Sequence, residues 1–147
     1  GDGSAIKLIN NEISRLSCNN IILIKPVSRK ELLNYYNISD VLFLQLNDID
    51  VFNKVLPSKI FDYGSFDKPI LAGVSGVAKS FLEENLPYSF IYEPGNHKEA
   101  IKKIDQIINF DKSKINNQSF VKKFDRKIIM DQMVNSFTRK LSWKRFL

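Results

Sequence analysis

Three neighbouring residues near the middle of the chain have side chains that could bind a negatively charged ligand. Ser58 offers a hydroxyl, Lys59 a positive charge, and Asp62 a carboxylate one helical turn further along. Pro57 suits the first position of a helix, where the free N–H groups of the first turn attract anions. A diphosphate fits such a helix start, and Asp62 could accept two hydrogen bonds from a vicinal diol such as a ribose.

The same residues have a simpler interpretation, in which they bind nothing. Pro57 and Ser58 then only start a helix, and Asp62 is a solvated carboxylate of its first turn. The sequence contains no nucleophile elbow, no phosphate-binding glycine loop and no zinc-protease motif. A ligand site made of Ser58, Lys59 and Asp62 is therefore the main chemical hypothesis that the residues themselves offer.

Metal and redox chemistry find little support in the sequence. Cys18 and His97 are the only residues of their types, which excludes a disulfide framework or a multi-Cys/His zinc site built from this sequence and points to a reducing compartment. Asp48 and Asp50 lie on an expected loop, where solvation is the expected state of a carboxylate. We expect no metal and no cofactor.

The elements that must position these residues alternate between strands and helices. Short apolar runs rich in β-branched residues predict buried parallel strands, and apolar residues at helical spacing predict helices. This alternation is typical of an α/β fold with a Rossmann-like parallel sheet and flanking helices, in which ligands bind at the carboxyl ends of the strands. The expected strands are 21–24, 41–46, 70–74 and 89–92; the expected helices are 4–17 with Ser4 as N-cap, 28–37 with a Ser28–Glu31 capping box, 57–66, 76–85 and 96–110.

Positive charge is concentrated in the C-terminal third of this 147-residue chain. The net charge is +6, and residues 95–147 carry 13 basic and 5 acidic side chains against 9 and 11 in residues 1–94. After a loop over 111–118, a final amphipathic helix is expected. Its apolar stripe consists of Phe120, Phe124, Ile128, Met133, Phe137 and Leu141.

This basic helix has three possible partners. Basic residues interleaved with aromatics, including Trp143 and Phe146, suit an anionic membrane surface and also nucleic acid. The helix could instead pack back across another domain of the same protein. We expect this packing first, a membrane surface second and nucleic acid last. No apolar run approaches the roughly 20 residues of a membrane span, so we expect a soluble or at most surface-bound protein.

Six segments, in this order and spacing, resemble the C-terminal donor-binding domain of a GT-B fold glycosyltransferase of the family 4 type, as found in bacterial polysaccharide and lipopolysaccharide assembly. They are 1–3, 20–26, 28–36, 39–41, 57–63 and 68–71. The similarity covers most of residues 1–110. It therefore implies a nucleotide-sugar-binding domain over 1–110 and a basic C-terminal helical segment over 111–147.

The resemblance implies a nucleotide-sugar donor and a glycan or lipid-linked acceptor, with a cytoplasmic location or a peripheral one at the inner face of the membrane. It places Asp62 at the ribose, Ser58 and Lys59 at the diphosphate, and the turn of Pro26, Val27 and Ser28 beside the base. Lys54 stands where the family often has a glutamate that contacts the transferred sugar. The Arg/Lys pair that grips the phosphates would precede Gly1.

The resemblance also implies an N-terminally truncated fragment. In the family's sheet order 3-2-1-4-5-6, the turn at residues 1–3 follows strand 2, so 21–24 is strand 3 and 41–46 is strand 4. These two strands are not neighbours in an intact sheet, and we expect either a gap between them or its closure. Two alternatives remain open: half of a nucleotide-sugar 2-epimerase, which shares the fold, and a non-catalytic Rossmann-like binding module whose basic tail docks a partner or nucleic acid.

Overall fold

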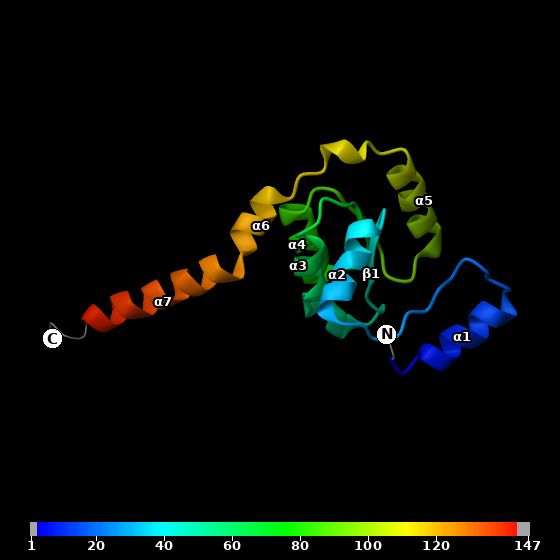
Figure 1. Cartoon of the computed structure of the whole chain (residues 1–147), viewed down its shortest axis with the longest axis horizontal. Helices are drawn as coiled ribbons and strands as arrows, with labels where there is room; N and C mark the ends of the chain where they lie inside the picture. The colour runs from blue at the N-terminus through cyan, green and yellow to red at the C-terminus, as the bar shows by residue number, and fades with distance from the viewer. Residues whose placement is uncertain (1–2, 144–147) are drawn as a thin grey trace. The chain divides into compact units, whose positions relative to one another are not determined.

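The computed structural model describes the backbone of residues 3–143 and the side chains as far as residue 138 (Figure 1). The chain divides into two compact units, Gly1–Ile38 and Ser39–Leu147. Each unit is described by itself. The expected division between residues 110 and 111 stays a prediction.

The first unit contains two helices joined by an extended segment. These helices are α1 (Ile6–Arg15) and α2 (Arg29–Ile38). The strand expected over 21–24 is wrong, because these residues are extended but form no ladder with the described part of the chain. All four side chains are exposed, and Ile22 is 83% exposed. An apolar, β-branched run becomes a buried strand only where neighbouring strands accept its backbone hydrogen bonds.

The starts of these two helices differ from each other. Ser4 is not the N-cap of α1; Ala5 holds that position, and no side chain caps the helix. The capping box of α2 is confirmed. The Glu31 N–H donates to Ser28 Oγ at 3.3 Å, and the Ser28 N–H donates back to Glu31 Oε2 at 3.0 Å. A reciprocal pair of this kind satisfies two backbone N–H groups at a helix start, with side chains that are three residues apart.

The second unit is built on a three-stranded parallel sheet, which confirms the strands expected over 41–46, 70–74 and 89–92. The strands are β1 (Leu42–Gln45), β2 (Ile70–Gly73) and β3 (Ser89–Tyr92), in the order β1-β2-β3. Two rows of the register matter below: Phe43 pairs with Leu71, which pairs with Phe90, and Gln45 pairs with Gly73, which pairs with Tyr92.

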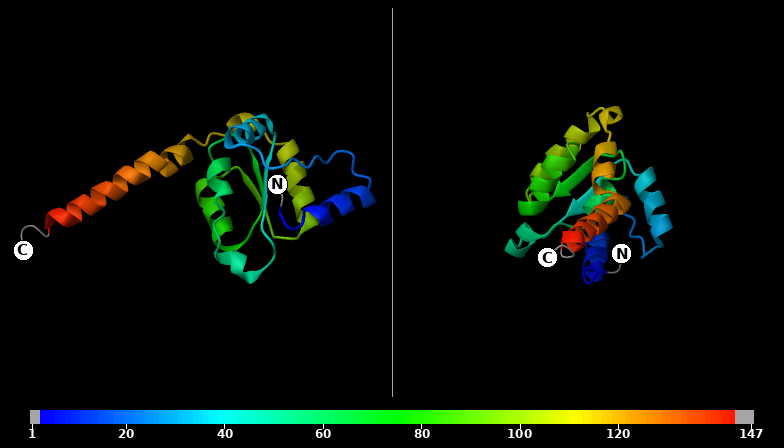
Figure 2. Two further views of the ribbon diagram at one scale, coloured as in Figure 1. Left: turned by 60° about the horizontal axis from the view of Figure 1, so that its bottom comes forward. Right: turned by 90° about the vertical axis from the view of Figure 1, so that its left-hand side faces the viewer.

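Helices cover both faces of this sheet (Figure 2). On one side lie α3 (Lys59–Tyr63) and α4 (Gly76–Asn85), and on the other lies α5 (His97–Ile108). Side chains alternate between the faces of a strand, so Leu71 and Tyr92 share one face and form a core cluster with Ile107 of α5. The unit is a Rossmann-like α/β fold. On the α5 side, however, Phe43 of β1 remains 55% exposed.

Connecting segments are more structured than the sequence suggested. The loop expected over 47–56 holds a 3-10 helix, η1 (Asp50–Lys54), and the one over 111–118 holds another, η2 (Lys112–Lys114). The helix expected over 57–66 is regular only over α3. Beyond both of its ends the backbone bonds are of the tighter i to i+3 type, as from the Phe66 N–H to the Tyr63 carbonyl at 3.1 Å.

The expected final helix is two helices, α6 (Gln118–Phe124) and α7 (Arg126–Trp143). Asp125 separates them with an extended backbone, and its Oδ1 accepts from the N–H groups of Lys127 and Ile128 at 2.8 and 3.0 Å. Asp125 thus acts as the N-cap of α7.

The expected single apolar stripe is therefore wrong. Phe120 and Phe124 of α6 pack against Phe61 and Phe81, whereas Met133 and Phe137 of α7 are exposed. The side chains of Leu141, Trp143 and Phe146 lie outside the described residues. No described helix has the length and apolar character needed to cross a membrane.

Candidate functional site

The carboxyl edge of the sheet is the place where its strands end and the following helices begin. At this edge Tyr92 bridges all three strands. Its hydroxyl donates a 2.7 Å hydrogen bond to Oε1 of Gln45, and its ring lies so close to Gly73 that a Cβ there would be 2.6 Å from the ring. Tyr92 of β3 therefore crosses β2 to reach the last residue of β1, and only a glycine in β2 allows it.

The Tyr92–Gln45 bond also fixes which polar group the edge presents to solvent. Burial raises the pKa of the Tyr92 hydroxyl, so it stays protonated and acts as a donor. Gln45 is exposed, and its amide oxygen is occupied by Tyr92. Its amide nitrogen makes no hydrogen bond within the described residues, which leaves a donor at the carboxyl end of β1.

A second tertiary contact holds the start of α4. Ser75 Oγ donates to Asn53 Oδ1 at 2.6 Å, which joins the residue before α4 to η1. Gly76 has φ of +57°, and a Cβ at this position would clash with the backbone carbonyl of Asn53. The η1 segment is therefore packed directly against the first residue of α4.

Because Ser75 turns toward Asn53, it does not cap α4. No side chain in the described residues caps the first-turn N–H groups of this helix. In α5, by contrast, Asn96 Oδ1 accepts from the Glu99 N–H at 3.1 Å. An uncapped helix start carries a partial positive charge and unsatisfied donors, so α4 offers an anion a better site than α5 does.

Two lysines near this edge differ in their surroundings. Lys79 of α4 forms an ion pair with Glu93 at 3.0 Å, and the Glu93 carboxylate raises the pKa of the Lys79 ammonium. Lys59 is exposed at the start of α3 and pairs with no described residue. Of these two lysines, Lys59 is therefore the one that remains available for a ligand.

The predicted residues Ser58, Lys59 and Asp62 lie on one side of the single turn of α3. Ile60 and Tyr63, which are buried, hold the opposite side against the core. Ser58 and Lys59 are exposed and Asp62 is half-buried. Asp62 follows Lys59 by three residues and Ser58 by four, so the carboxylate is a neighbour of both the ammonium and the hydroxyl on the helix surface.

The other three predicted residues belong to the first unit. Pro26 and Ser28 are exposed and Val27 is half-buried, just before α2. The Ser28 hydroxyl is already used, because it donates to Glu31 Oε2 at 2.8 Å. The structure describes these residues and those of α3 in separate units.

Sequence reasoning missed the side chains that build the carboxyl edge. They are Gln45, Asn53, Ser75, Gly76 and Tyr92. The available signal was positional: Gln45 and Tyr92 end their strands, and Ser75 and Gly76 lie two and three residues after the end of β2. A rule that marks polar residues and glycines at strand ends would have found four of them.

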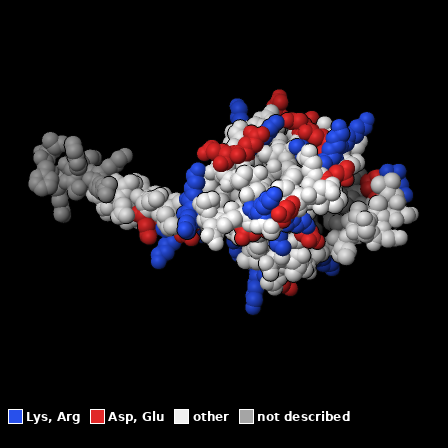
Figure 3. Space-filling view, turned by 90° about the horizontal axis from the view of Figure 1, so that it is seen from above, with Lys and Arg blue, Asp and Glu red and all other residues white. Residues whose placement is uncertain are grey.

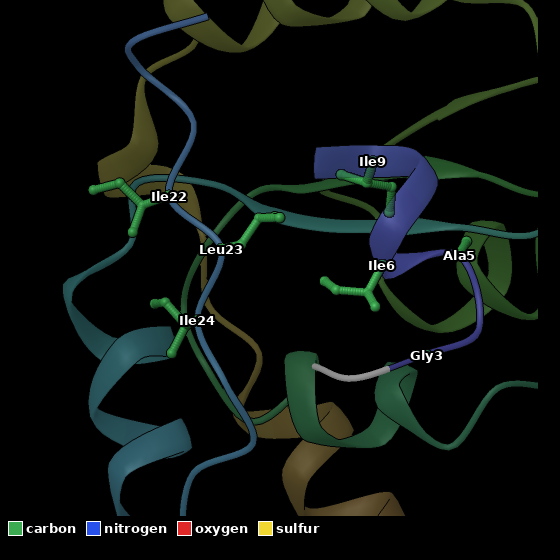
Figure 4. Close-up of a pocket in the computed structure, with 7 residues that line it drawn as sticks. All are labelled: Gly3, Ala5, Ile6, Ile9, Ile22, Leu23 and Ile24. Carbon is green, nitrogen blue, oxygen red and sulfur yellow. The ribbon is translucent and has the colours of Figure 1, made fainter. Parts of the chain in front are cut away.

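The first unit also contains a pocket, of about 390 Å³, between α1 and the extended segment. In Figure 4, Ile6 of α1 and Leu23 point toward each other across it. The lining residues are all apolar: Gly3, Ala5, Ile6, Ile9, Ile22, Leu23 and Ile24. This pocket is open to solvent, and its lining side chains offer no group for acid–base or nucleophilic chemistry.

Clusters of metal-ligating side chains do not occur among residues 3–138; no three His, Cys, Asp or Glu side chains there come together. Comparison with known protein families, with curated proteins and with solved structures finds no match to this chain. A functional interpretation therefore depends on the residues of this chain and on their geometry.

Proposed function

We propose that this chain binds the nucleotide-sugar donor of a glycosyltransferase that transfers a sugar to a glycan or lipid-linked acceptor at the inner face of the membrane. The observation that carries this proposal is that Ser58, Lys59 and Asp62 are neighbours on α3, the helix that follows the first strand of a parallel sheet. The strand order β1-β2-β3 agrees with strands 4-5-6 of the fold that the sequence resembles.

In this proposal Lys59 binds the diphosphate through its ammonium and, with Ser58, through its backbone N–H, since the N–H groups of Ile60 and Phe61 already donate within the turn at 3.1 Å. Helix α4, whose start is uncapped, packs beside α3 through the rings of Phe61 and Phe81, 5.5 Å apart, and in this proposal its first-turn N–H groups add further donors. A departing nucleoside diphosphate carries growing negative charge in the transition state. Preorganised donors and a lysine stabilise that charge more than they stabilise the bound substrate.

Asp62 has a different role, which is to recognise the nucleoside. A carboxylate accepts charge-assisted hydrogen bonds from both hydroxyls of a ribose. Its position on the same side of α3 as Lys59, three residues away, suits a ligand that carries its ribose next to its phosphates. Asp62 would therefore select a nucleotide over inorganic diphosphate.

An NMR titration with a nucleoside diphosphate and with inorganic diphosphate tests these roles. We expect amide shifts around Ser58–Asp62 and weak binding in the millimolar range, about 4 kcal/mol. The variant Asp62→Ala should abolish the preference for the nucleotide, and Lys59→Ala should weaken both ligands. The matched controls are Asp105→Ala and Lys98→Ala, on exposed positions of α5.

Two results would contradict the proposal. One is a set of shifts confined to residues 111–138, which would mean nonspecific anion binding by the basic segment. The other is an Asp62→Ala variant that keeps the same preference for the nucleotide as the unmodified chain.

A further inference from the structure

Helix α7 carries an apolar stripe that no described residue covers. Met130, Met133, Val134 and Phe137 follow the i, i+3, i+4, i+7 spacing of one helix face. Their exposed fractions are 49%, 50%, 55% and 59%. Phe120, on the preceding helix α6, is only 4% exposed. The contrast shows that α6 is packed against α3 and α4, while α7 presents apolar surface.

Basic residues flank this stripe. Residues 111–147 contain ten Lys and Arg and three Asp and Glu, and within residues 126–138 the single acidic residue is Asp131. Lys122 and Lys123 precede α7, and Arg126 and Lys127 lie in its first turn. In Figure 3 the described part of α7 is mostly uncharged surface, with Lys and Arg gathered where α7 adjoins α6.

We propose that α7 binds an anionic lipid surface and lies in its plane, with the stripe of Met130, Met133, Val134 and Phe137 facing the acyl chains. A helix that begins with basic residues, has an otherwise polar opposite side and carries an exposed apolar stripe can lie in the plane of a lipid surface. Since no described helix is apolar and long enough to cross a membrane, the binding is to the surface. Lys and Arg next to the stripe add attraction to acidic headgroups.

Charge favours a lipid surface over a second copy of this chain. Two copies paired through their stripes would bring two strongly basic segments together, and their like charges would repel each other. Nucleic acid attracts the same charges, but a continuous stripe of Met, Val and Phe has no counterpart on a phosphate backbone. An acidic membrane satisfies both the charge and the apolar area.

The α6 helix would transmit this attachment to the folded sheet. The Phe120 and Phe124 rings lie 4.7 Å apart, and Phe124 is 5.5 Å from Phe61 of α3. Lys123 Nζ donates to Asn85 Oδ1 at 2.7 Å, at the end of α4. Docking of α7 would therefore hold the second unit at the membrane. The inference depends on α7 alone and does not require the proposed donor binding.

Vesicle co-sedimentation of the full chain tests the inference. Vesicles of phosphatidylcholine are compared with vesicles in which about one third of the lipid is phosphatidylglycerol, at about 0.1 M and about 0.5 M salt. We expect binding that needs phosphatidylglycerol and falls at least several-fold at high salt. The variant Phe137→Glu should lower binding about tenfold or more. Ile101→Glu on α5 is the matched control, because Ile101 is 57% exposed and Phe137 is 59% exposed.

Three outcomes would overturn the inference. The first is no sedimentation with either vesicle, and the second is equal sedimentation with neutral and anionic vesicles. The third is a concentration-dependent dimer in sedimentation velocity that Phe137→Glu abolishes, which would assign the stripe to self-association. Far-UV circular dichroism checks that both variants are folded. If Phe137→Glu is unfolded, Met133→Gln takes its place in the binding experiment.

Discussion

The hydroxyl of Tyr63 in α3 donates a 2.9 Å hydrogen bond to the backbone carbonyl of Phe43 in β1. Alternate residues of a parallel strand bond to the same neighbour. The Leu42 N–H donates to the Pro69 carbonyl just before β2, and the Leu46 N–H donates to the Gly73 carbonyl in β2. The Phe43 carbonyl therefore points to the other side, where β1 is the edge of the described sheet. Tyr63 therefore satisfies an edge carbonyl and fixes α3, with Lys59 and Asp62, to the sheet.

Removing this hydroxyl tests how much the bond stabilises the unit. Tyr63 is buried, and Tyr63→Phe removes its donor without creating a large cavity. We expect the free energy of unfolding to fall by about 0.5–1.5 kcal/mol, measured by urea denaturation. Tyr88→Phe is the control, because the Tyr88 hydroxyl makes no hydrogen bond within the described residues; an equal loss in both variants would contradict a specific role for Tyr63.

A pair of glycine variants separates backbone strain from steric clash at the start of α4. Gly76 and Gly95 both have positive φ, +57° and +78°. A Cβ at Gly95 meets open space, but one at Gly76 meets the Asn53 backbone. Gly95→Ala should therefore cost only the φ strain, about 1 kcal/mol. Gly76→Ala should cost clearly more and loosen η1, measured by thermal unfolding and by amide exchange at Asn53.

If Gly76→Ala and Gly95→Ala lowered the melting temperature equally, that result would contradict the contact between η1 and the start of α4.

The aromatic contacts of α6 should control whether the C-terminal helices stay packed against α3 and α4. Gly64 has a helical φ of −64°, so Gly64→Ala adds no backbone strain, yet its Cβ would overlap the Phe120 ring. We expect faster proteolytic cleavage near Asp125 in this variant. Phe120→Ala should give the same cleavage and lower the free energy of unfolding by about 3–5 kcal/mol.

Unchanged cleavage in Gly64→Ala would show that α6 is anchored by other contacts. Ser65→Ala serves as the neighbouring control, because Ser65 is exposed and its hydroxyl, within the described residues, bonds only to the Asp62 carbonyl of its own turn, at 2.6 Å.

The capping box of α2 predicts an acid-sensitive helix. The hydrogen bond from the Ser28 hydroxyl, and next that from the Ser28 backbone, lower the pKa of the Glu31 carboxyl below its ordinary value of 4.5. A carboxylate whose pKa is lower in the folded state stabilises the fold above its unfolded pKa, and this contribution is lost as the pH falls through the folded pKa. Helicity of α2 should therefore decrease in acid, as the pH falls below the ordinary Glu pKa of 4.5 and through the lower pKa of the folded state.

Ser28→Ala should move the Glu31 pKa upward, toward the ordinary value, in an NMR titration of the side-chain carboxyl. Ser80→Ala, at an exposed position of α4, should leave that pKa where it is. A Glu31 titration unaffected by Ser28→Ala would refute the capping box as the cause.

Local patterns in the sequence predicted most of the second unit. The runs that became β1, β2 and β3 were recognisable because strands of a parallel sheet are buried on both faces and read as continuous apolar segments. The capping box of Ser28 and Glu31 was equally predictable, since both partners lie within one turn. Ser58, Lys59 and Asp62 could be grouped in advance for the same reason.

Tertiary structure decided what depends on a distant partner. The run over 21–24 has the composition of a buried strand, yet Ile22 is 83% exposed, because a strand exists only where another strand accepts its hydrogen bonds. The bond between Tyr92 and Gln45 joins residues 47 positions apart, and that between Ser75 and Asn53 joins residues 22 apart. No local period records such pairs, since only the packing of β1, β2 and β3 with their helices brings them together.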